Sequence, residues 1–323
     1  LLAFASANGG QAGNTILALT ASAADPRDFQ GQDYVTVLND QLEPTGAYSV
    51  GDPFKQALAM LGVAAVGEAV PVEAENWLVS QQAATGAWDD GFGTSDNADA
   101  TAMAIMALVA TGQTTADPAL LKAIEFLAAA QQPGGWEYGP GLGAGANSTA
   151  LVVQALSALG EDWYSDASPW MKDGLTPLEA LLAYQSVSGA FQSDFGQGPF
   201  DDFYATVQAI PAVSGRPFPL PARYEAVRRG VACLDVLQDD LTGGWPSFAN
   251  GPIDAAGTSR AIQALVVAGE DPRSPRWTTP GGVYAIDALE ALTPTYLDSG
   301  RGGRVGIVMQ GVAAAGSPLT VTD

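Results

Sequence analysis

One short pattern recurs along this chain: a glutamine closes an apolar stretch, and a glycine followed by an aromatic residue comes soon after. The clearest copies are QQAATGAWDDGFG (81–93) and QQPGGWEYGP (131–140). The pattern returns at 184–196, at 237–248 and, more weakly, at 38–49. Five copies of one turn indicate a fold built from repeats, because a single irregular core has no reason to reuse a turn.

Two kinds of apolar segment alternate between these turns. The first kind is rich in alanine, nearly uncharged and apolar on almost every side, which is typical of a buried helix. It occupies 13–24, 54–67, 100–112, 148–160, 204–215, 258–269 and 304–316. Equivalent positions in successive segments lie 41 to 55 residues apart, a period that fits a helix-pair repeat. These segments predict a row of inner helices.

The second kind of segment is amphipathic and predicts outer helices with one face in solvent. In 118–132 the apolar side chains share one face, and Lys122 and Glu125 lie off it. The segment 176–185 begins with Thr176, Pro177 and Glu179, a typical helix start. The alternation predicts an all-α fold, an α/α toroid of about six inner–outer pairs. We expect one closed domain over 1–323, with a start processed within 1–8 and a short tail at 316–323, because neither end is polar enough to cap an open array.

The balance of charge limits the partners. The chain has 13 basic against 35 acidic residues, a net charge of −22, and only three lysines. A surface this negative repels nucleic-acid phosphates and anionic lipids, so we expect no nucleic-acid partner and no membrane insertion. The first residues, LLAFASA, resemble the end of a secretory signal. The first turn of a helix would have a similar sequence. We therefore expect a secreted, extracellular or cell-surface protein.

Missing residue types exclude several chemistries. The chain has no histidine, which rules out a Ser-His-Asp triad and any metal site that uses imidazole. Its single cysteine, Cys233, leaves no intrachain disulfide and sits in an apolar setting typical of a buried small residue.

The repeated turn resembles the signature of the prenyltransferase and squalene-cyclase repeat superfamily. The Gln-x-x-x-Gly-x-Trp motif or a shortened form of it is matched by Gln82, Gly86, Trp88, Gln132, Gly135, Trp136, Gly244 and Trp245, with Phe191 replacing the tryptophan in the fourth copy. The loops at 160–182 and 269–292 resemble bacterial secreted, transcobalamin-like members. The resemblance implies an α/α toroid.

In this interpretation the motif residues are structural ties between neighbouring repeats. A glutamine at the end of an outer helix can bond the backbone of the next repeat, and the tryptophan covers that end. The predicted ties are Gln82, Trp88, Gln132, Trp136 and Trp245.

The enzymes of this superfamily leave residue signatures that this chain lacks. Neither Asp-x-Asp-Asp nor Asp-Asp-x-x-Asp occurs, and no histidine is present for zinc. We therefore predict a non-catalytic binding or interaction domain. Two alternatives stay open: a self-assembling surface or filament protein, which makes a homo-oligomer a further expectation, and a carbohydrate-active or terpene-cyclase-like enzyme.

A binding site is expected where the turns lead into the inner helices. These loops gather at one mouth of the predicted ring and carry carboxylates and aromatic rings, which suit a small molecule, a glycan or a protein. The predicted ligand-binding residues are Asp89, Asp90, Phe92, Tyr138, Phe200, Asp201, Asp202, Phe248 and Asp254. The same loops contribute Tyr48, Asp52, Asp194 and Phe195. Helix capping is the competing explanation, and it suits Asp99 and Asp201 best.

The segment 89–99 is the densest in carboxylates. Its spacing does not match a known calcium loop, but Asp89, Asp96 and Asp99 could hold Ca²⁺ if the loop folds back; we expect no other cofactor. We also expect Asp89, Asp90, Asp201 and Asp202 to face one opening, where repulsion raises some of their pKa values. As exposed groups, Asp89 and Asp90 should tolerate substitution by asparagine.

Overall fold

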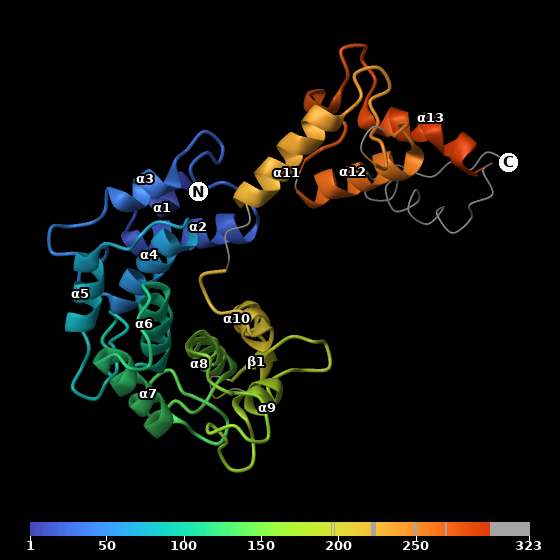
Figure 1. The fold of residues 1–323 in the computed structure, drawn as a ribbon. Helices are drawn as coiled ribbons and strands as arrows, with labels where there is room; N and C mark the ends of the chain where they lie inside the picture. The colour runs from blue at the N-terminus through green and yellow to red at the C-terminus, as the bar shows by residue number, and fades with distance from the viewer. Residues whose placement is uncertain (195, 197, 221–223, 249–250, 269, 298–323) are drawn as a thin grey trace. The chain divides into compact units, whose positions relative to one another are not determined.

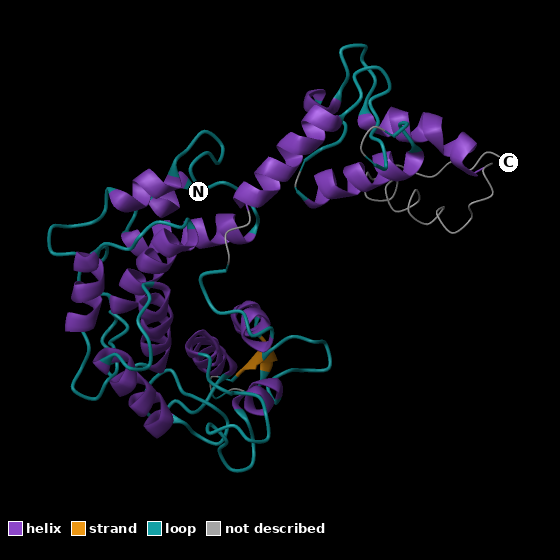
Figure 2. Ribbon diagram, viewed as in Figure 1, coloured by secondary structure: helices purple, strands orange, loops and turns teal. Residues whose placement is uncertain are grey.

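The computed structural model describes residues 1–194, 196, 198–220, 224–248, 251–268 and 270–297 (Figure 1). The chain divides into two compact units, Leu1–Ala222 and Arg223–Asp323, and each is described by itself. Helices dominate the described residues, and their one sheet is a short pair of strands (Figure 2). The predicted all-α fold class is confirmed.

The first unit contains ten of the helices. They are α1 (Leu2–Ala5), α2 (Gly9–Ala21), α3 (Tyr34–Asn39), α4 (Pro53–Ala65), α5 (Val72–Ser80), α6 (Ala98–Ala110), α7 (Pro118–Ala130), α8 (Ala146–Leu159), α9 (Pro177–Leu182) and α10 (Phe203–Val213). Strand β1 (Gln192–Ser193) pairs antiparallel with β2 (Phe200–Asp201) just before α10.

Inner and outer helices alternate in this unit as the sequence predicts. Helices α2, α4, α6, α8 and α10 form a row in which each packs on the next, and α3, α5, α7 and α9 each pack on the inner helix before them. Because each outer helix returns the chain, the inner helices start at the same end of the row. We call the loops that lead into α4, α6, α8 and α10 the rim.

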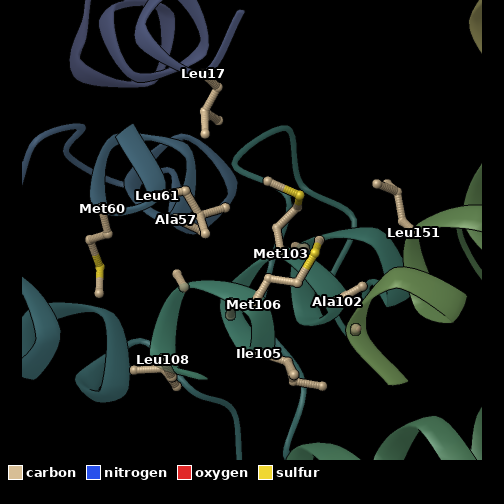
Figure 3. Close-up of a cluster of buried hydrophobic side chains, with 14 of the residues drawn as sticks. Leu17, Ala57, Met60, Leu61, Ala102, Met103, Ile105, Met106, Leu108 and Leu151 are labelled. Atoms are coloured by element: carbon tan, nitrogen blue, oxygen red, sulfur yellow. The ribbon is translucent and has the colours of Figure 1, made fainter. Parts of the chain in front are cut away.

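Small residues allow the inner helices to pack closely. The central helix α6 is buried along most of its length, and its alanines leave room for the neighbouring backbones. Gly62 of α4 lies against α2, where a Cβ atom would stand 2.7 Å from the Cα atom of Gly13. Figure 3 shows part of the resulting core, with Met60 and Leu61 of α4 and Met103 and Met106 of α6.

The turns that carry Trp88 and Trp136 tie α5 to α6 and α7 to α8. The indole Nε1 of Trp88 donates to the carbonyl of Leu78 in α5 at 2.7 Å, and its backbone N–H donates to the hydroxyl of Thr101 in α6 at 3.1 Å. Trp136 makes the same two bonds, at 2.7 Å to the carbonyl of Leu127 and at 3.1 Å to Thr149. Each tryptophan is buried and links the end of an outer helix to the first turns of the next inner helix.

Glutamine side chains tie successive outer layers together. The amide of Gln82 donates to the carbonyl of Gly86 at 2.9 Å and to that of Ala119, in α7, at 2.8 Å. In the next repeat the side-chain amide of Gln131 donates to the carbonyl of Trp170 at 2.7 Å. The predicted residue, Gln132, does not make this bond. Gln132 instead exchanges two backbone hydrogen bonds with Gly135. The side chain one position earlier therefore makes the long-range contact.

Two glutamines of the inner helices bridge α8 and α10. The side-chain oxygen of Gln208 in α10 accepts the side-chain amide of Asn147 in α8 at 2.8 Å. The amide of Gln154 in α8 donates to the backbone carbonyl of Gln208 in α10 at 3.3 Å. Gln263, in the other unit, bonds Ser259 of its own helix at 3.2 Å.

The second unit contains α11 (Tyr224–Leu237), α12 (Ala255–Val267), a short 3-10 helix η1 (Pro275–Trp277) and α13 (Ala285–Leu297). Helix α12 packs on α13 around a core that includes Trp245, Ile262, Trp277 and Leu289. Trp245 repeats the turn geometry, donating to the carbonyl of Leu234 at 2.7 Å and to Thr258 at 3.0 Å. The sequence predicts a buried Cys233, but this residue is exposed in α11, so that prediction is wrong.

The predicted inner segment 304–316 and the tail 316–323 lie outside the described residues. Closure of the repeats into a single ring over 1–323 stays a prediction. Across the described part of the chain, no helix combines the length and apolar character needed to cross a membrane.

Candidate ligand-binding rim

Several rim carboxylates begin the inner helices. The carboxylate of Asp52 accepts the N–H of Lys55 at 2.9 Å, and that of Asp202 accepts the N–H of Tyr204 at 2.8 Å. At the start of α6 the capping side chain is Asn97, which accepts the N–H of Ala100 at 2.8 Å. The capping expected of Asp99 and Asp201 is therefore wrong: their neighbours Asn97 and Asp202 occupy the cap positions, because each lies just before the first helical residue.

Asp90 organises the loop between Trp88 and α6. Its carboxylate accepts the backbone N–H of Phe92 at 2.8 Å and that of Thr94 at 3.0 Å, and the hydroxyl of Tyr138 donates to its other oxygen. Asp90 is buried. Burial alone would raise its pKa, but these hydrogen bonds outweigh it and hold the pKa of Asp90 below its usual range. Asp90 is thus a tether between two rim loops.

Asp99 is the least satisfied carboxyl at the rim. It lies in the first turn of α6 and is 8% exposed, and its Oδ1 has no hydrogen-bond partner within the described structure. Burial raises the pKa of Asp99 to about 6; a hydrogen bond from Ser148 of α8 opposes this rise, and the charge on Asp90 adds to it. The Asp99 carboxyl therefore stays protonated at pH values at which an ordinary aspartic acid has already ionised.

Tyr138 links this loop to the one before α8. Its hydroxyl donates to Asp90, and its backbone carbonyl accepts the side-chain amide of Asn97 at 2.7 Å. Burial, together with the hydrogen bond to Asp90, raises the pKa of Tyr138 to about 12. The phenol therefore stays protonated and remains a donor.

Phe92 projects from the tip of this loop. Its side chain is 78% exposed, and the ammonium of Lys55 lies 5.1 Å from the ring centroid. Lys55 also pairs with Asp52 at 2.6 Å. The loop passes close to this pair, since a Cβ atom on Gly91 would stand 2.6 Å from the carboxyl carbon of Asp52. The ring is thus presented on a fixed loop and not packed into the core.

The fourth rim loop is held by a separate network. The hydroxyl of Ser193 donates to Asp202 at 2.6 Å and to the side-chain oxygen of Asn147 at 3.1 Å, which connects the β1–β2 hairpin to the start of α8. Asp201 is exposed and accepts hydrogen bonds from Ser188 at 2.6 Å and Gln192 at 3.1 Å; these bonds lower its pKa. The Phe200 ring beside it is also exposed.

The remaining predicted rim residues have different environments. Tyr48 is buried, and Asp194 accepts N–H groups from its own loop at Gly196 and Gly198. Phe195 lies outside the described residues. In the second unit Phe248 is exposed, and Asp254 accepts the N–H of Gly257 at the start of α12.

The geometry offers no support for calcium at the predicted residues. Asp89 accepts the N–H of Gly91 at 2.6 Å, Asp96 accepts the hydroxyl of Thr85, and Asp99 is buried beside Ser148. Among residues that the structure describes, no three carboxylate or cysteine side chains gather as a metal site.

The expectation that repulsion raises the pKa values of the paired carboxylates is wrong for Asp90 and Asp201, because hydrogen-bond donors surround both. The expectation that Asp90 is exposed is also wrong, because its side chain is buried. Asn97 and Ser148, which partner the loop, are not among the predicted site residues. Asn97 could have been found, since an asparagine just before an alanine-rich helix is a typical cap.

No protein-family model matches this sequence, and no curated protein is significantly similar to it. Similar solved structures include a variant of a type II terpene cyclase from Scytonema bound to merosterolic acid A, at 16% identity and a TM-score of 0.39, covering 91% of this chain and 82% of that one. A protein from Actinoplanes is similar at 14% identity and a TM-score of 0.41, covering 94% of this chain and all of the other. Likenesses this distant assign neither a family nor an activity.

Proposed function

We propose that this protein is a non-catalytic binding domain, and that its rim holds a hydroxyl-rich ligand such as a glycan. The observation that carries the proposal is the exposure of Phe92 on a loop whose backbone is fixed by Asp90. An aromatic ring left in water on a fixed loop costs folding energy that burial would recover, so contact with a ligand is a reason for its place.

Polar groups suited to sugar hydroxyls surround this ring. Tyr138 is partly exposed next to Phe92's loop, and Asp89 lies at the loop's start with one carboxylate oxygen bonded to Gly91. Phe200 and Asp201 repeat the pairing of ring and carboxylate two inner helices away. A row of rings with acceptors between them fits an extended, uncharged ligand better than an anion, which the net charge of −22 repels.

Two finer versions belong to the same proposal. A secreted or cell-surface location would bring the rim into contact with extracellular glycans. Capture of a corrinoid, as in transcobalamin-like proteins, would need the ring held by its edges, because no histidine is present to bind cobalt.

A glycan array followed by calorimetry tests the proposal. We expect binding to fall at least tenfold in Phe92→Ala, since one aromatic anchor contributes about 1.4 kcal/mol or more to such a contact. Tyr164→Ala is the matched control: Tyr164 is also exposed, but it follows α8 and so lies at the end of the row away from the rim. A protein that binds no glycan, or that loses binding equally in both variants, would overturn the proposal.

A second candidate is an enzyme that uses Asp99 as a proton donor to an alkene or a glycosidic oxygen. The supporting observation is the contrast between Asp99, whose pKa is raised to about 6, and its neighbour Asp90, whose pKa is lowered. Burial of Asp99 weighs against it, because a substrate needs access to the proton. Loss of turnover in Asp99→Asn, with binding retained, would favour this candidate over a pure binding domain.

A further inference from the structure

Polar side chains join α6 and α8 at the rim. Asp99 of α6 is bonded by Ser148 of α8. The Tyr138 hydroxyl holds Asp90, and the Asn97 amide holds the Tyr138 carbonyl at 2.7 Å. These contacts join the aromatic loop 89–97 to the loop before α8, and Asp99 lies buried beside them.

Among the residues that the structure describes, the charged groups around this junction leave Asp99 without a paired cation. Helix α8 contributes no titratable side chain, and on α4 the ammonium of Lys55 is paired with Asp52 and stacked on Phe92. On α7, Lys122 and Glu125 are both exposed.

The loops add further acidic groups. Asp89 and Asp96 are bonded within their own loop region, and Glu137 accepts the N–H groups of Gly141 and Gly143, each at 3.0 Å. Asp90 is the negative group that acts on Asp99 directly.

We propose that Asp99 is a proton-operated lock on the rim: with its proton the loop 89–97 stays docked to the loop before α8, and without it the two loops separate more readily. The lock follows from the geometry, because a charge on Asp99 would be buried beside an ionised Asp90, with one oxygen unpartnered. It holds whichever of the two candidate functions is right.

The direction of the pH dependence follows from the two states of Asp99. When docked its pKa is about 6, and when exposed its pKa returns to the ordinary 3.8, so the docked state binds the proton more tightly. The stabilisation is complete below about pH 4 and is lost as the pH rises to about 6. Asp90 acts in the opposite direction, but its lowered pKa confines its change to more acidic pH.

Hydrogen exchange of the Phe92 and Thr94 amides, which both donate to Asp90, measures the docking directly. After correction for the intrinsic exchange rate, we expect their protection to fall roughly fiftyfold between pH 4 and pH 7, as the two pKa values require. Asp99→Asn keeps the size of the side chain and removes its proton equilibrium, so its protection should be almost independent of pH. Glu125→Gln, which changes an exposed carboxyl on α7 and leaves Asp99 and Asp90 in place, should behave as the wild type does.

Direct titration of the Asp99 carboxyl carbon by NMR in the wild-type protein completes the test and does not depend on any variant folding. A midpoint near 6 supports the lock, and a midpoint near 4 overturns it. The lock is also overturned if the wild-type protein protects these two amides equally at pH 4 and pH 7.

Discussion

Two junctions of this chain, one in each unit, are built on the same plan. In the first unit the rings of Trp136 and Trp170 lie 6.2 Å apart and are tilted by 54°. In the second unit Trp245 and Trp277 lie 6.1 Å apart and are tilted by 51°. Each pair joins the tryptophan of a Gly–Trp turn to the tryptophan of the loop that enters an outer helix.

The polar contacts of the two junctions match as well. Gln131 donates to the carbonyl of Trp170 at 2.7 Å, and Gln238 donates to that of Trp277 at 3.3 Å. A glutamate accepts each loop indole, Glu161 at 3.2 Å and Glu270 at 3.1 Å. Such agreement between segments over a hundred residues apart indicates that the junction is a self-contained element specified by local sequence.

The surroundings of the two junctions differ. The first is continuous with the core formed by α2 to α10, whereas the second joins a separate core in the second unit. The second also contains Arg276, whose guanidinium lies 5.1 Å from the centroid of the Trp277 ring and 2.9 Å from a Glu270 oxygen; no such stacked cation is found at Trp170 among the residues that the structure describes. Comparing the two junctions therefore separates the stability that the shared contacts provide from the stability that the surroundings of each junction add.

The largest effect is expected when the turn tryptophan is removed. Trp136→Ala should lower the free energy of unfolding by about 3–5 kcal/mol, the range for truncating a large buried aromatic side chain. Trp245→Ala should cause a loss of the same order within the second unit, because both indoles are buried and make the same bonds. Chemical denaturation gives the overall loss, and hydrogen exchange in α8 and α12 shows where each variant opens. Opening at α8 in Trp245→Ala would contradict a self-contained element.

The next effect tests which glutamine makes the tie. Gln131→Ala should cost about 1 kcal/mol, because it leaves the Trp170 carbonyl without its donor. Gln132→Ala should change stability by less than about 0.5 kcal/mol, since its paired bonds with Gly135 are made by the backbone. Paired denaturation curves measure both, and the reverse order of losses would show that the contact at 2.7 Å is not the stabilising one. Gln238→Ala extends the test to the second unit.

These two positions show how far the sequence alone could go. The repeat, the inner and outer rows and the buried tryptophans of the turns follow from periodicity and from the Gly–Trp spacing. The choice between Gln131 and Gln132 does not, because it depends on α7 ending at Ala130 with Gln131 in extended backbone. A shift of one residue turns a different side chain toward the next repeat.

The same limit on prediction from the sequence applies to the rim. The sequence placed many carboxylates there, and composition alone suggested that they repel one another. Their behaviour depends on donors from other loops, such as Tyr138 on Asp90, whose distance along the chain hides the contact. Asp99 was grouped with its neighbours, although burial sets it apart from them.

The smallest effect is expected at the feature that the two junctions do not share. Arg276→Ala should cost about 0.5–1 kcal/mol at low salt, because its side chain is 43% exposed and ion pairs near the surface contribute little. The position that precedes the loop tryptophan in the first unit is Pro169, so that junction lacks the equivalent of Arg276. Most of the loss should disappear in 1 M salt, where screening acts within about 3 Å.

Removing the shared glutamate separates packing from charge at this site. Glu161→Gln keeps an acceptor for the Trp170 indole, and no cation in the described part of the chain pairs with Glu161, so its cost should not depend on salt. Glu270→Gln keeps the acceptor for Trp277 but loses the partner of Arg276, so its cost should fall as salt is added. Thermal unfolding at two salt concentrations gives both slopes. Equal slopes would mean that Arg276 stabilises its junction by lying over the Trp277 ring, with the ion pair contributing nothing measurable.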